Sequence, residues 1–200
     1  MLYQFNSAEN HILIKCSELT STPFDYGIID CAFSEEFAVD LLNWLKNEAP
    51  WRLKETDFYE QWEFSLADVH LDGFVFHKLN SAAFRNIILS KMKTLFVEDF
   101  EDDIKIAFHK MVKGQTIRIH NDFIRGIETH RLVVQLNEAD IVGGYAILFN
   151  DSNPKNIHRV IEPRHNQGFV FAISERSYHA VSTIHSGDRY TIVCSLTKKS

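Results

Sequence analysis

The stretch IKIAFHKMVKGQTIRIHND, residues 104–122, holds two short runs of β-branched and aromatic residues on either side of a turn at Lys113-Gly114. Similar runs continue to the end of the chain: RLVVQLN (131–137), YAILFN (145–150), HRVIEP (158–163), QGFVFAI (167–173), HAVSTI (179–184) and RYTIVCSLT (189–197). Glycine and polar residues separate them, as at Gly143-Gly144 and Ser186-Gly187-Asp188. Eight such runs predict an antiparallel β-sandwich or barrel.

The amino-terminal half predicts two helices. Ser34 is a good N-cap before Glu35 and Glu36, and apolar residues then follow at helical spacing to about residue 48. A second helix is expected from Ser81 to about residue 95 on the same grounds. One or two strands are expected in the first thirty residues.

Residues 50–64 carry an unusual density of aromatic side chains among charged neighbours, namely Trp51, Phe58, Tyr59 and Trp62. These rings could cover one edge of the core or line a substrate groove. The sequence leaves both interpretations open.

The chain of 200 residues, 45% of them hydrophobic, is long enough to bury one core. No linker, repeat or low-complexity tract suggests a boundary. We therefore expect a single domain over residues 1–200, with strands and helices in 1–103 and a β-core in 104–200. The 16 phenylalanines against 3 methionines favour a β-rich interior.

Charge and cysteine content exclude several classes of protein. The net charge of −6 and the absence of a basic run argue against nucleic acid as a partner. Cys16, Cys31 and Cys194 have neither disulfide-framework nor zinc-site spacing. No secretory signal or bilayer-spanning stretch is recognisable, so we expect a cytoplasmic protein without membrane contact.

The triplet His120-Asn121-Asp122 follows a β-prone run, and side chains on a strand repeat every second residue. Alternation would therefore place His120 and Asp122 on one face. His179 begins a later run and could add a second imidazole. Two imidazoles and one carboxylate suit iron(II) with open coordination positions, although a His-x-Asp pair is also common on exposed strands.

Arg189 starts an otherwise apolar strand, and Thr191 should point the same way. A buried guanidinium needs an anion, and its planar fork fits a carboxylate that a neighbouring hydroxyl can also contact. An internal Asp or Glu could equally be that anion.

The order His120-x-Asp122, Gly143-Gly144, His179 and Arg189-x-Thr191 resembles the 2-oxoglutarate and iron(II)-dependent dioxygenases, most closely their prolyl 4-hydroxylase-like branch. The resemblance covers residues 108–196. It implies a mainly β fold, a double-stranded β-helix (jelly roll, cupin-like), with the amino-terminal helices against its larger sheet. At Gln135 this chain departs from the tyrosine that often helps to hold the co-substrate in that branch, and an amide could take that role.

From the resemblance we expect His120, Asp122 and His179 to hold Fe(II), and Arg189, Thr191 and Gln135 to bind 2-oxoglutarate, with ascorbate as a candidate reductant. Dioxygen would be consumed, 2-oxoglutarate would be decarboxylated to succinate, and an unactivated carbon would be hydroxylated. Asp122 favours hydroxylation, because halogenating relatives lack this carboxylate.

The sequence predicts only the class of the substrate and does not predict the oligomeric state. A peptide or protein side chain, or an amino-acid-like small molecule, would suit the size of the chain, and Arg118 and Arg131 are the candidate substrate contacts. The alternative is a non-catalytic or non-oxygenase cupin-like metal-binding module. The nucleic-acid demethylase branch is disfavoured, because Ser195 stands where that branch usually has a second arginine.

Overall fold

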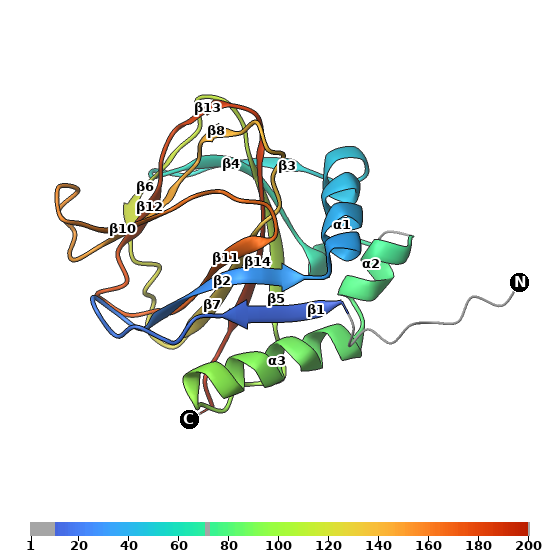
Figure 1. Cartoon of the computed structure of the whole chain (residues 1–200), viewed down its shortest axis with the longest axis horizontal. Coiled ribbons are helices and arrows are strands. Elements are labelled where there is room, and N and C mark those ends of the chain that lie inside the picture. Colours follow the sequence, from blue (N-terminus) through green and yellow to red (C-terminus); the bar gives the residue numbers. More distant parts are fainter. Residues whose placement is uncertain (1–10, 71–72, 200) are drawn as a thin grey trace, which may run out of the picture.

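The computed structural model describes residues 11–70 and 73–199, which form two antiparallel sheets that face each other (Figure 1). The larger sheet has the strand order β1-β2-β11-β7-β14-β5-β4-β3. Its strands are β1 (Ile12–Cys16), β2 (Tyr26–Phe33), β3 (Arg52–Glu55), β4 (Glu60–Ser65), β5 (Lys105–Met111), β7 (His130–Gln135), β11 (Gln167–Ala172) and β14 (Arg189–Leu196).

The smaller sheet has the order β10-β9-β12-β6, with β6 (Ile117–His120), β9 (Ala146–Phe149), β10 (Ile157–Ile161) and β12 (His179–Val181). A two-stranded ribbon joins β8 (Val142–Gly143) to β13 (Ile184–Ser186). All strand pairs in the described residues are antiparallel. This arrangement is the predicted jelly roll.

Three α-helices cover the outer side of the larger sheet: α1 (Glu35–Asn47), α2 (Phe74–Leu79) and α3 (Ala82–Phe96). Figure 1 shows them on the side away from the smaller sheet. Ser34 and Ser81 cap α1 and α3 as predicted, because each hydroxyl accepts a hydrogen bond from the backbone N–H three residues on. The short α2 was not predicted, since six residues give too little periodicity to detect.

Strand alternation divides the core in two. Along β7, Leu132 and Val134 pack toward the helices, whereas Val133 packs toward the smaller sheet. Along β14, Ile192 faces the helices and Val193 faces inward. The inward face of the larger sheet is therefore free to carry polar residues such as Arg131, Gln135, Arg189 and Thr191.

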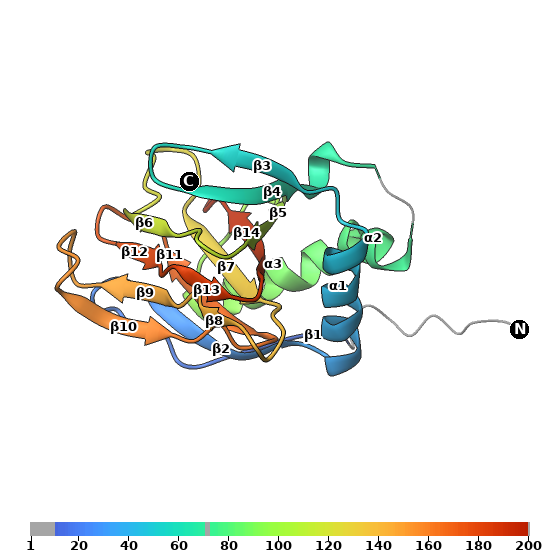
Figure 2. The same cartoon turned by 90° about the horizontal axis from the view of Figure 1, so that it is seen from above.

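The amino-terminal half also extends the larger sheet, because β4 pairs with β5 and β3 lies beyond it. Trp51 and Phe64 at the base of the β3–β4 hairpin pack against each other and the main core. At its tip, Tyr59 bridges to Ile117 of β6, and Phe58 accepts a backbone hydrogen bond from Arg118 (3.1 Å). Figure 2 shows this hairpin lying over β6. Residues 50–64 thus cover one edge of the core at the base of the hairpin and contact β6 at its tip.

In the part of the chain that the structure describes, no helix is long and apolar enough to cross a membrane.

Candidate active site

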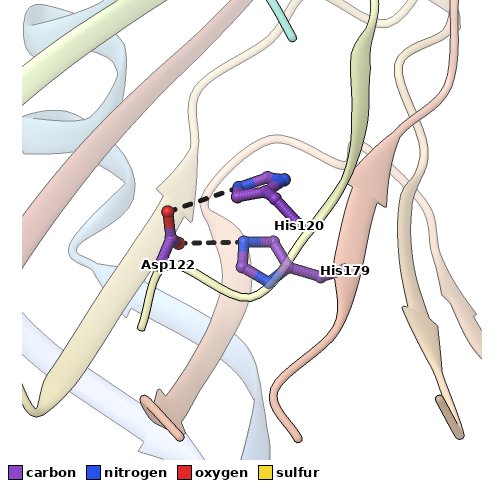
Figure 3. A group of neighbouring side chains, drawn as sticks. All are labelled: His120, Asp122 and His179. Carbon is purple, nitrogen blue, oxygen red and sulfur yellow. Dashed lines mark ion pairs between the residues drawn. The ribbon is translucent and has the colours of Figure 1, made fainter. Parts of the chain in front are cut away.

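Three side chains with metal-binding chemistry meet between the sheets. His120 ends β6, His179 begins β12 and the two residues pair directly across these strands. Asp122 lies beside both rings, with Oδ1 at 3.4 Å from Nε2 of His120 and Oδ2 at 3.1 Å from Nε2 of His179 (Figure 3). Together these residues form the one group of potential metal ligands found among residues 11–70 and 73–199.

Backbone hydrogen bonds orient both rings. Nδ1 of His120 lies 2.8 Å from the carbonyl oxygen of Arg118, and Nδ1 of His179 lies 2.8 Å from that of Ser177. A carbonyl only accepts, so each Nδ1 carries a proton, and each Nε2 faces Asp122, where it can bind a metal once its own proton is lost. Burial also lowers the pKa of His179, which favours the neutral ring that a metal ligand requires.

Asp122 is held by a turn and not by strand alternation, which corrects the reasoning from sequence. Strand β6 ends at His120, and Asp122 adopts φ 58°, a left-handed conformation that aspartate tolerates better than most residues. Burial by itself raises the pKa of the Asp122 carboxyl. Hydrogen bonds with His120 and His179 and the charge of Arg131 outweigh that effect, so the pKa lies well below its ordinary range.

Strand alternation from His120 would place Arg118 on the same face, but Arg118 does not line the cavity of the metal ligands. The pairing of β6 with β12 shifts register between His179↔His120 and Val181↔Ile117, so three residues of β6 span two of β12. Such a bulge reverses the expected alternation and turns Ile117, not Arg118, toward the cavity beside His120. Arg118 is exposed and lines a separate hollow on the other side of the hairpin tip, with Lys113 and Glu55.

Arg131 does lie at the centre, but it contacts protein carboxylates. Its Nη1 donates to Oδ2 of Asp122 (2.5 Å), and its Nη2 donates to Oε2 of Glu128 (2.9 Å). These two carboxylates raise the pKa of Arg131 although burial lowers it. Arg131 therefore holds Asp122 in place through an ion pair, and its predicted role as a substrate contact stays a prediction.

Arg189 and Thr191 come together as predicted. Nη1 of Arg189 lies 3.3 Å from Oγ1 of Thr191, and both side chains are buried and line the same cavity as the metal-binding group. Among the described residues Arg189 has no acidic partner, and its Nε has no hydrogen-bond acceptor. Burial lowers the pKa of this guanidinium to about 10, so it is charged at neutral pH and suited to an anion.

The side chain of Gln135 makes its hydrogen bond outside the cavity. Its Nε2 donates to the backbone carbonyl of Glu162 (3.1 Å), and Gln135 is not among the residues that line the cavity. The predicted contact with a co-substrate is thus not supported. The residue lies on the inward face, but at the end of β7 beyond the cavity.

The cavity that holds these residues has a volume of about 290 Å³. Apolar walls come from β7, β9, β11, β12 and β14, and the β3–β4 hairpin adds Lys54, Tyr59, Gln61 and Glu63. His109 of β5 also lines the cavity; it pairs with Thr191, and burial lowers its pKa to about 4. The alternation Ala107, His109, Met111 could have revealed His109 from sequence, whereas the hairpin residues gave no comparable signal.

A jelly roll that encloses two histidines, one carboxylate and a buried unpaired arginine has the architecture of mononuclear metal-dependent oxygenases. Residues 106–196 match the model of the 2OG-Fe(II) oxygenase superfamily. The match covers the jelly-roll core and identifies the protein as a 2-oxoglutarate-dependent dioxygenase, in which His120, Asp122 and His179 suit Fe(II). No curated protein sequence matches the chain.

Solved structures of prolyl hydroxylases share the fold. A prolyl-4-hydroxylase from Pseudomonas putida aligns with a TM-score of 0.68 at 14% identity, covering 88% of this chain and 93% of that one. A Trichoplax adhaerens prolyl hydroxylase, solved with a hypoxia inducible factor peptide fragment, aligns with a TM-score of 0.67 at 14% identity, covering 86% and 82%. A viral collagen prolyl hydroxylase from Paramecium Bursaria Chlorella virus-1, in its 2OG complex, gives 0.56 at 16%, covering 86% and 94%.

Proposed function

We propose that this enzyme hydroxylates an unactivated carbon of a peptide or protein side chain. In this proposal His120, Asp122 and His179 hold iron(II), and Arg189 with Thr191 holds the far carboxylate of 2-oxoglutarate. The observation that carries it is the buried Arg189, which has no acidic partner among residues 11–70 and 73–199 yet shares one cavity with the ligand group. An unpaired buried guanidinium is costly unless a ligand neutralises it.

The residues present fit both groups. The two Nε2 atoms and the Asp122 carboxylate lie within 4.8 Å of one another, as ligands around a single ion would. When bound, iron(II) and 2-oxoglutarate supply the oxidising power for the reaction, as the keto acid is converted to succinate and CO2. The protein's own contribution is to orient these groups and to exclude water with Val133, Phe169 and Phe171.

Peptide substrates are favoured over small amino-acid-like molecules by the likeness to the Trichoplax adhaerens enzyme, which was solved with a peptide. That likeness lies in the fold, so the identity of the oxidised residue stays open.

Succinate formation tests the proposal. Purified protein is incubated with iron(II), ascorbate and 2-oxoglutarate, and succinate is followed by mass spectrometry, since enzymes of this kind turn over slowly without substrate. A parallel anaerobic titration measures binding of iron(II) and of the keto acid. The His179→Ala variant should lose both signals, whereas His185→Ala, which removes an exposed histidine outside the cavity, should keep them. Wild-type protein that neither binds iron(II) with 2-oxoglutarate nor forms succinate would refute the proposal.

A further inference from the structure

A second hollow of about 300 Å³ opens beside the candidate active site. It lies between the tip of the β3–β4 hairpin and the loop that follows β6, and it shares Phe58, His120, Asp122 and Arg131 with the first cavity. The two hollows therefore adjoin at the ligand group. A molecule that reaches His120 and Asp122 from this side must lie across the second hollow.

Four large apolar side chains line this hollow while remaining exposed, and we call them the apolar rim. Phe58 and Phe123 are each 39% exposed, Ile124 is 61% exposed and Ile127 is 46% exposed. Apolar side chains clustered at the mouth of a site typically mark a binding surface, because water contact costs free energy that a ligand can recover.

The loop that carries the apolar rim is anchored at both ends. Ser177 donates to the carbonyl of Asn121 (2.8 Å), and the Asn121 amide donates to the carbonyl of Glu175 (3.2 Å). Beyond the turn, the Thr197 hydroxyl donates to the carbonyl of Ile127 (2.9 Å). The rim is thus presented by a fixed loop.

Charged groups along both hollows are already paired with one another. Lys54 contacts Glu63 at 2.7 Å, and Arg131 contacts both Asp122 and Glu128. His109 is neutral at pH 7, because burial lowers its pKa to about 4. Among the described residues that line the two hollows, this leaves Arg189 as the one unpaired ionic group outside the metal-ligand set, and the proposed function assigns it to 2-oxoglutarate.

A free amino acid would therefore find no partner for its ammonium and carboxylate groups, and burying them unpaired is unfavourable. In a peptide both groups are neutral amides. We infer that the second hollow binds an apolar side chain next to the oxidised residue of a peptide, and that the oxidised residue is itself uncharged. This inference rests on the proposed function and identifies the substrate as a neutral, apolar peptide segment.

The test uses short N-acetylated, C-amidated peptides of random sequence. The holoenzyme is incubated with this library, iron(II), ascorbate and 2-oxoglutarate, and peptides that gain one oxygen atom are sequenced by tandem mass spectrometry. A parallel reaction contains a mixture of free amino acids. Succinate is measured in both reactions, which separates failure of the inference from failure of the proposed function.

Oxidised peptides should be enriched about tenfold in Leu, Ile, Val, Met or Phe beside the oxidised position, the discrimination typical of a hydrophobic pocket. Ile124→Asp should abolish this enrichment but keep peptide-independent succinate formation. Ile157→Asp is the matched control, because Ile157 on β10 is 50% exposed and lines neither hollow, and it should keep the enrichment.

Succinate without oxidised peptide, or enrichment in charged flanking residues, would overturn the inference while the iron(II) and 2-oxoglutarate assignment stands. Oxidation of a free amino acid would overturn the inference and also the peptide substrate of the proposed function. A dimer in sedimentation that Ile124→Asp converts to a monomer would also overturn it, because the rim would then be a subunit interface. Absence of succinate in the wild type would overturn both.

Discussion

Replacing Arg131 by leucine should weaken metal binding by about 10- to 100-fold, the usual effect of losing a group that orients a metal ligand. Arg131 donates to Oδ2 of Asp122 and to Glu128 at the same time. Because the charge of Glu128 offsets that of the guanidinium, the pair should repel a bound cation little. Its main effect on the metal is therefore to fix the orientation of the Asp122 carboxylate.

The same substitution should destabilise the metal-free protein. Loss of one partner from a fully buried ion pair costs roughly 3–5 kcal/mol, because the remaining charge is left uncompensated. The Arg131 side chain is 24% exposed, so we expect a smaller loss, about 2 kcal/mol. A bound divalent ion compensates Asp122, so saturating metal should restore part of this loss.

Calorimetric titration with Mn(II) under anaerobic conditions measures the affinity, and urea unfolding with and without Mn(II) measures the stability. Arg131→Lys should fall between wild type and leucine, because an ammonium keeps the charge but not the planar fork that reaches two carboxylates. Arg159→Leu removes an exposed arginine of β10 and serves as the control. Wild-type Mn(II) affinity in Arg131→Leu would refute the argument that Arg131 positions Asp122.

Arg189→Met should abolish 2-oxoglutarate binding in calorimetry. It should also raise the free energy of unfolding of the ligand-free protein by about 1 kcal/mol, because a buried unpaired charge is removed. Destabilisation of the ligand-free protein would mean that Arg189 stabilises the fold. Burial lowers the pKa of His130 from its ordinary value near 6.5 to about 4, so the unfolded chain takes up a proton first. Stability should therefore decline by about 3 kcal/mol as pH falls from about 6.5 to 4. Urea unfolding across this pH range should show a shallower decline of stability in His130→Leu. An unchanged slope would contradict the attribution of the decline to His130. Gly168→Ala should lower the free energy of unfolding by about 3 kcal/mol or more, because the added Cβ would lie 1.9 Å from the carbonyl oxygen of Val133 on β7. An unchanged urea midpoint would show that β11 and β7 can move apart to admit the methyl group.

Local features of the sequence were sufficient to predict much of the fold and part of the candidate site. The serine caps, the eight β-prone runs and the Arg189-x-Thr191 pair depend on contacts within a few residues or on simple alternation, and the structure contains all of them. The chemical types of His120, Asp122 and His179 and their order along the chain were also sufficient to propose a metal site.

Contacts between distant segments of the chain determined the remaining features of the site. The register of β6 against β12 creates the bulge that turns Arg118 outward, and the left-handed turn at Asp122 brings its carboxylate to the two rings. Arg131 meets Asp122 and Glu128 because β7 lies beside that turn, and the β3–β4 hairpin closes over β6 from more than fifty residues away. Bulges, turns and strand neighbours depend on contacts between distant segments, which no local pattern of residue types specifies.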